Sequence, residues 1–111
     1  MSKYHNRKVE LDGYLFDSAA ESRRWSELKL AEHCGDILDL QRQVEYKIVV
    51  NGQLICKYRA DFVYRENWEG SNGRTIVEDV KSEATRKLPV YRLKKKLMKA
   101  IFGIEIWEQM A

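Results

Sequence analysis

The stretch that decides the fold is DFVYRENWEGSNGRTIVEDVK, which spans residues 61–81. Its two ends, residues 58–64 and 75–81, are rich in Val, Ile, Tyr, Phe and Thr, a composition typical of β-strands. The residues between them, 65–74, include Asn, Gly and Ser and indicate a loop. The stretch therefore predicts two neighbouring strands that pair as a hairpin.

Both predicted strands carry carboxylates, Asp61 on the first and Asp79 on the second. Because side chains alternate between the faces of a strand, Asp79 and Lys81 point the same way and Glu78 points the other way. In a hairpin Asp61 can lie near Asp79, and two close carboxylates repel unless a cation such as Mg²⁺ lies between them. This pattern of an acid followed by acid-x-Lys is the minimal site of metal-dependent phosphodiester cleavage. The same spacing also occurs in ordinary hairpins with solvated charges. The other segments of the chain are therefore needed to choose between a metal site and a solvated hairpin.

Composition predicts one globular domain, residues 1–111. The chain is 44% hydrophobic and 33% charged, with a formal net charge of +3, so a nucleic-acid surface would need local clustering of cations. Cys34 and Cys56 lie far apart, in no metal-ligand spacing. With no long apolar run and no secretory segment, we expect a cytoplasmic protein with no membrane association.

The first third of the chain predicts a hairpin followed by a helix. Asp12-Gly13 lies between short alternating runs, a strong hairpin signal. A helical pattern covers residues 19–33, with Ser18 as the N-cap and Glu21 at the capping-box position. Glu21 also shares the helix face of Trp25, so its carboxylate can reach a metal held by the two aspartates. From the residues alone, helix capping is the favoured role of Glu21. This role is compatible with binding a metal.

The remaining pattern predicts strands at residues 37–50, 54–64, 75–81 and 104–107, the first of them either one long strand or two strands with a bend. Asn51-Gly52 marks the turn between the first two. Gln43 either faces the site or is a plain polar strand position, and the second interpretation is favoured. Pro89 suits the first turn of a helix that ends at Gly103. Its predicted apolar stripe comprises Val90, Leu93, Leu97, Ala100 and Ile101. The fold class is therefore α/β, a mixed sheet flanked by helices and preceded by a hairpin.

The second helix has a one-signed charge pattern. No acidic residue occurs between Ala84 and Ile104, which favours an anion-binding surface over a solvated face. A basic N-terminal tail could add to it, although solvation is the favoured interpretation of the tail. The predicted DNA-binding residues are Arg7, Lys8, Arg86, Lys87, Arg92, Lys94 and Lys95.

The order helix-strand-strand-strand-helix-strand, with these acids, resembles the restriction-endonuclease-like core of the PD-(D/E)XK nuclease superfamily. The resemblance narrows to a small phage and prophage family long labelled as of unknown function, similar to Holliday-junction resolvases and transposon endonuclease subunits. The motifs that carry it are Lys3-Tyr4-His5-Asn6, Asp12-Gly13, Phe16-Asp17-Ser18, Glu21, Gln43, Arg59-Ala60-Asp61-Phe62 and Glu78-Asp79-Val80-Lys81. Ala60 stands where the superfamily pattern has its proline.

The resemblance implies a Mg²⁺-dependent DNA endonuclease, with Mn²⁺ as a substitute metal, that acts on structured DNA in phage recombination or replication. It implies Glu21, Asp61, Asp79 and Lys81 as catalytic residues, with the carbonyl of Val80 joining the three acids as a metal ligand. Expected partners are DNA, phage recombination or replication proteins, and a second copy in a homodimer. The alternatives are a DNA-binding module that does not cut and an interaction protein of a phage replication complex.

Overall fold

The computed structural model describes residues 7–111. It confirms the predicted α/β class, with two sheets and two main helices. The elements are β1 (Val9–Leu11), β2 (Tyr14–Phe16), α1 (Ala19–His33), β3 (Ile37–Val50), β4 (Gln53–Glu66), β5 (Thr75–Lys81), the 3-10 helix η1 (Thr85–Lys87), α2 (Pro89–Phe102) and β6 (Trp107–Met110). Within the described chain, no helix is both long and apolar enough to cross a membrane.

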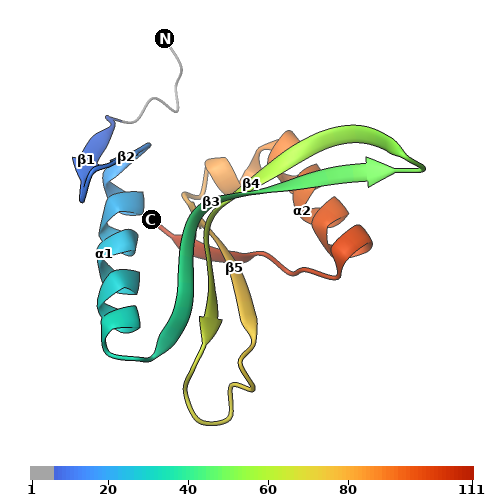
Figure 1. Cartoon of the computed structure of the whole chain (residues 1–111). Coiled ribbons are helices and arrows are strands. Elements are labelled where there is room, and N and C mark those ends of the chain that lie inside the picture. Colours follow the sequence, from blue (N-terminus) through green and yellow to red (C-terminus); the bar gives the residue numbers. More distant parts are fainter. Residues whose placement is uncertain (1–6) are drawn as a thin grey trace.

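The main sheet has the strand order β3-β4-β5-β6 (Figure 1). The first three strands are antiparallel, and β6 pairs with β5 in parallel, with Asp79 opposite Glu108. A parallel neighbour requires a crossover, and α2 supplies it. This helix–three strands–helix–strand order agrees with a restriction-endonuclease-like arrangement.

Two hydrophobic cores hold the helices to the sheet. The core beneath α1 contains Trp25 and Phe62, which stack with ring centroids 6.1 Å apart. The core beneath α2 contains Met98 and Tyr58. The far halves of β3 and β4 form an arm that lies over α2 (Figure 1), and Tyr46 of this arm contacts Phe102 at 6.0 Å between ring centroids. The two cores therefore divide the sheet between the helices.

The structure corrects two details of the prediction. The predicted apolar stripe of α2 is only partly right: Leu97 packs against the core, but Val90 is 65% exposed and Leu93 58%, whereas Tyr91 and Met98 are buried. Periodicity finds an apolar stripe, but it does not reveal which side of the helix meets the sheet. The last strand is also displaced, since β6 begins at Trp107 rather than at residue 104. Residues 104–106 instead lead away from α2, with Ile106 buried in the core beneath that helix.

Candidate active site

Asp61 and Asp79 lie together where β4 and β5 separate. The last paired residues of the two strands are Phe62 and Glu78. One step further, the Asp61 amide donates to Asp79 Oδ1 at 3.0 Å, and the Val80 amide donates to Asp61 Oδ2 at 2.9 Å. Each carboxylate thus accepts a backbone bond from the opposite strand. We call this arrangement the aspartate clasp, and it confirms that the two acids lie side by side.

The strand that carries Asp61 changes its buried face at this residue. Simple alternation would place Tyr58, Ala60, Phe62 and Tyr64 on one side of the sheet. In the structure Tyr58 and Ala60 pack in the core beneath α2, whereas Phe62 and Tyr64 pack in the core beneath α1. The aspartate clasp therefore lies at the junction of the two cores.

Gln43 on β3 is part of the site, so its interpretation as a plain polar strand position was wrong. It has a φ of 56°, a left-handed conformation that costs free energy for a residue other than Gly. Its Nε2 donates to Glu21 Oε1 at 3.0 Å, a contact between residues 22 positions apart. The unusual backbone conformation is therefore associated with a contact at the site.

Glu21 lies on the first turn of α1 and contacts the site through Gln43. The predicted N-cap is confirmed, because the Ser18 hydroxyl accepts from the Glu21 amide at 3.1 Å. The Glu21 carboxylate is not confined to this local role. It is buried and accepts the bond from Gln43, but Glu21 itself does not line the cleft that Asp61, Asp79 and Lys81 share.

Lys81 follows Asp79 on the same face of β5, as predicted. Its Nζ lies 4.2 Å from the centroid of the Tyr91 ring, close enough for a cation–π interaction. Lys81, Asp61, Asp79 and Gln43 all line a cleft of about 550 Å³. The cleft is therefore built by β3, β4 and β5, with Val90, Tyr91 and Lys94 contributed by α2.

Burial and mutual repulsion raise the pKa values of the acids. The pKa of Asp61 rises to about 8, mainly because the group is buried and secondarily because Asp79 and Glu21 are near. Burial also raises the pKa of Asp79 and of Glu21. Lys81 acts in the opposite direction on both aspartates, and its charge does not compensate for the burial. These carboxyl groups would gain from a nearby cation.

Glu78 points away from the cleft, as the strand alternation predicted. It is fully buried and accepts two bonds from Arg24 of α1, at 2.7 and 2.9 Å, and one from the Tyr64 hydroxyl at 2.7 Å. These three bonds occupy the carboxylate within the core. Glu78 therefore anchors α1 to the sheet and is not a rival ligand in the cleft.

Several residues that line the cleft were not predicted to be part of the site. The Tyr58 hydroxyl donates to Asp79 Oδ2, which fixes that carboxylate from a second side. Lys57, Arg59 and Tyr91 also line the cleft. Tyr58 lies three residues before Asp61, and alternation would place it on the opposite face. No sequence signal revealed it, because the change of face at Asp61 could not be foreseen.

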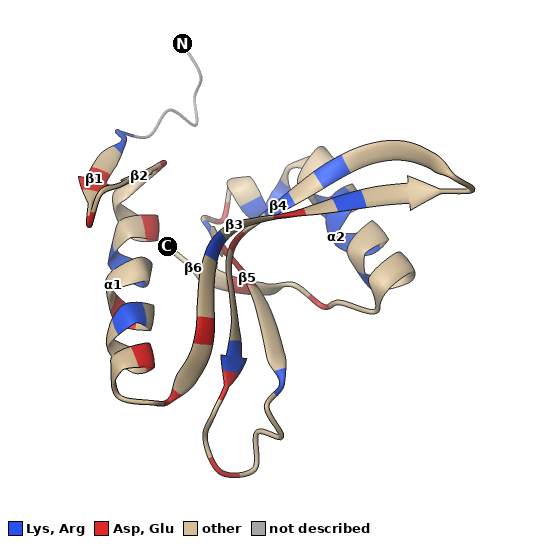
Figure 2. Cartoon of the chain, viewed as in Figure 1, with Lys and Arg blue, Asp and Glu red and all other residues tan. Residues whose placement is uncertain are grey.

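The predicted DNA-binding residues divide into three groups. Lys94 lines the cleft. Arg86, Lys87, Arg92 and Lys95 line a separate groove, and Figure 2 shows the recurrence of Lys and Arg along α2. Arg7 and Lys8 are exposed ahead of β1 and are not among the residues that line either space.

Whether the cleft suits a metal ion depends on its donors. Within residues 7–111, no three His, Cys, Asp or Glu side chains converge closely enough to form a metal site by themselves. Mg²⁺ usually needs only one or two protein carboxylates, with water and substrate phosphates completing its shell. The aspartate clasp offers two carboxylates whose pKa values are raised, chiefly by burial. The donor chemistry therefore suits Mg²⁺ at this pair.

The fold and the cleft define the class: an α/β protein of restriction-endonuclease-like arrangement, with paired acids where two central strands separate. Comparison with family models then shows that the chain belongs to the family described as protein of unknown function (DUF1064), which matches residues 1–107. No curated protein and no solved structure matches the chain.

Proposed function

We propose that this protein is a Mg²⁺-dependent DNA endonuclease of the PD-(D/E)XK type. The observation that carries the proposal is the aspartate clasp, with Lys81 in the same cleft. Asp61 and Asp79 would hold the metal, with Glu21 and the Val80 carbonyl as the further ligands that the resemblance implies. The bound ion would supply charge stabilisation at the scissile phosphate and a lowered pKa for its water.

The protein's own residues would position the substrate around these acids. The Lys81 ammonium would orient the attacking water or stabilise the negative charge that develops at the reacting phosphate. Tyr58 fixes Asp79, since its hydroxyl donates to one carboxylate oxygen while the Asp61 amide donates to the other. Lys57, Arg59 and Lys94 line the cleft and would attract the phosphate backbone.

The resemblance extends the proposal to the biological setting. It favours cleavage of structured DNA, as by junction resolvases, in phage recombination or replication in the bacterial cytoplasm. A homodimer and contacts with phage proteins belong to the same set of expectations. Cleavage of two opposed strands of a junction would suit a two-fold dimer.

Cleavage is tested with labelled branched and linear DNAs incubated with Mg²⁺, Mn²⁺ or EDTA. The wild-type protein should cut at least one substrate with metal and none in EDTA. Asp79→Asn and Lys81→Ala should each lower the cutting rate by at least about 100-fold, because each removes a group that acts on the reacting phosphate. DNA binding should survive in both variants. Activity that persists in Asp79→Asn would contradict the assignment of the site.

The second candidate is a DNA-binding module that does not cut. It is favoured by one observation: within residues 7–111, the acids do not form a metal site of three or more side chains. Wild-type protein that binds the same DNAs but leaves all of them intact with either metal would support this candidate. An interaction protein of a replication complex would show neither cutting nor salt-dependent binding.

A further inference from the structure

The surface of α2 carries a second basic groove, separate from the cleft. The groove has a volume of about 660 Å³ and lies between α2 and the chain that leads into β6. Its basic residues are Arg86, Lys87, Arg92, Lys95, Lys96 and Lys99. Two acids, Glu105 and Glu108, also line it, so the cations outnumber the acids and the groove is electropositive.

Four cations of the groove lie close together on one side of α2, where their mutual repulsion destabilises the helix. Arg92, Lys95, Lys96 and Lys99 fall within an arc of about 100° and span about 10 Å along the helix axis. Arg92 and Lys96 are like charges at i,i+4, as are Lys95 and Lys99, and such like-charge pairs destabilise a helix. Duplex DNA carries several phosphate charges over the same length, so it would relieve this repulsion.

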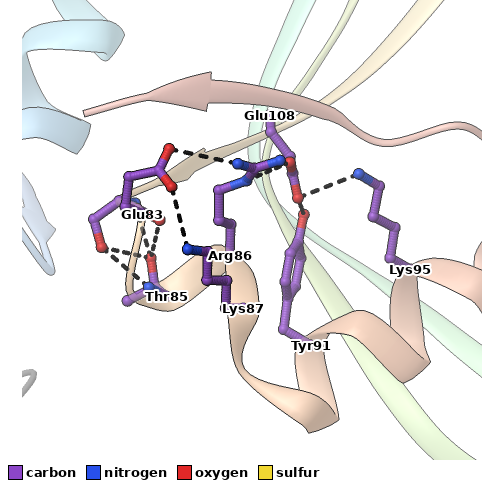
Figure 3. A network of polar contacts seen from close by, with 8 residues as sticks. Glu83, Thr85, Arg86, Lys87, Tyr91, Lys95 and Glu108 are labelled. Carbon is purple, nitrogen blue, oxygen red and sulfur yellow. Dashed lines mark hydrogen bonds and ion pairs between the residues drawn. The ribbon is translucent and has the colours of Figure 1, made fainter.

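The acids of the groove leave part of this charge free. Glu108 binds Arg86 at 3.4 Å and Lys95 at 3.2 Å, and it accepts from the Tyr91 hydroxyl at 2.7 Å (Figure 3). Glu83 pairs with Arg86 and Lys87, and Glu105 pairs with Lys99. These ion pairs, counted within residues 7–111, leave Arg92 and Lys96 unpaired.

The groove and the cleft share a wall. Tyr91 lines the cleft and lies beneath Lys81, while its hydroxyl reaches Glu108 in the groove. A DNA segment in the groove would therefore lie beside the segment that occupies the cleft, with the Tyr91–Glu108 pair between them.

We propose that the groove between α2 and β6 binds the phosphate backbone of DNA at a position distinct from the segment that is cut. This inference rests on the proposed function and adds a second DNA contact to it. Because the contacts are to phosphates, binding there should be insensitive to sequence and sensitive to salt. Two free cations, Arg92 and Lys96, should account for much of the effect.

The test measures the affinity of labelled duplex DNA by fluorescence anisotropy in EDTA, over a range of salt concentrations. The double variant Arg92→Ala/Lys96→Ala should bind at least about tenfold more weakly at low salt, and its salt slope should be less steep by about two. The matched control, Arg23→Ala/Lys29→Ala, removes the same charge from exposed positions on α1. It should change the affinity by less than about threefold.

A second variant is expected to bind DNA more tightly, and a gain of affinity cannot result from misfolding. Glu105→Gln removes an exposed acid from the groove and releases Lys99, so it should tighten DNA binding by about threefold. The groove assignment is overturned if the Arg92/Lys96 variant matches the α1 control, or if Glu105→Gln binds no better than wild type. The first result would leave the groove open to an acidic protein segment and would leave the proposed nuclease intact. Wild-type protein that binds no DNA at any salt concentration would overturn the groove and the proposed function together.

Discussion

The charged form of Asp61 is the form that would bind a metal, but it is also the form that destabilises the folded protein. Its ordinary pKa is 3.8, and its surroundings raise the pKa to about 8. The folded state therefore binds a proton more tightly than the unfolded state does. Above the ordinary pKa this proton is lost more readily on unfolding, so the charged form of Asp61 destabilises the folded protein.

The free energy of unfolding of the metal-free protein should fall as the pH rises from about 4 to 8. Asp61→Asn should weaken this dependence, because the amide oxygen can still accept from Val80 and the group no longer ionises. Urea unfolding in EDTA at several pH values gives the comparison. If the free energy of unfolding of the wild-type protein rises over this pH range, ionisation of Asp61 does not destabilise the folded state.

At the same scale, the sequence predicted the acids and the lysine but not their supports. Asp61, Asp79 and Lys81 are recognisable because a strand has a period of two and the motif is local. Gln43 and Tyr58 are not recognisable in this way. Their contacts depend on a left-handed residue in β3 and a change of face in β4, and neither follows from residue type.

Among the elements, α1 is joined to the sheet by a buried charge pair as well as by its apolar face. Arg24 forms two hydrogen bonds to Glu78, whose side chain is fully buried. Breaking such a pair by removing one partner leaves an uncompensated charge in the core. The position of Glu21, on the first turn of the same helix, depends on this anchor.

Glu78→Gln should lower the free energy of unfolding by about 3 kcal/mol. The matched control is Glu27→Gln, which removes an exposed partner of the same Arg24 and should cost less than about 0.5 kcal/mol. Urea denaturation of the two variants measures the difference. Cutting by folded Glu78→Gln should stay near wild type, since Glu78 faces away from the cleft. Equal losses of stability in both variants would mean that the Arg24–Glu78 pair is dispensable.

Element boundaries were largely predictable, and element orientation was not. The limits of α1, β3 and β5 match the prediction, because caps and turn pairs such as Asn51-Gly52 are local signals. The side of α2 that is buried was predicted wrongly. Val90 and Leu93 of the predicted stripe are exposed and only Leu97 packs against the core, whereas Tyr91 is turned towards Lys81 and Glu108. Which side of α2 is buried depends on contacts with β5 and β6, and the residues of these strands are distant in sequence.

For the molecule as a whole, a ligand that binds only the folded state raises its stability. A Mg²⁺ concentration about 100 times the dissociation constant would add about 2.7 kcal/mol, which corresponds to a rise in Tm of roughly 10 °C for a domain of this size. Thermal unfolding with and without Mg²⁺ should show this rise in the wild-type protein. The double variant Asp61→Asn/Asp79→Asn should show none, and an equal rise in both proteins would place the ion elsewhere.

The aspartate clasp also has a consequence for hydrogen exchange. In most of a sheet an amide proton is protected by a carbonyl oxygen, whose charge does not change with conditions. The amides of Asp61 and Val80 are instead protected by carboxylates. Their exchange rates should therefore respond to pH and to Mg²⁺ beyond both the intrinsic effect and the change in global stability, and the amide of Val77, within the paired part of β5, reports that global change. Two backbone protons would then report on the charge of the site without any substrate.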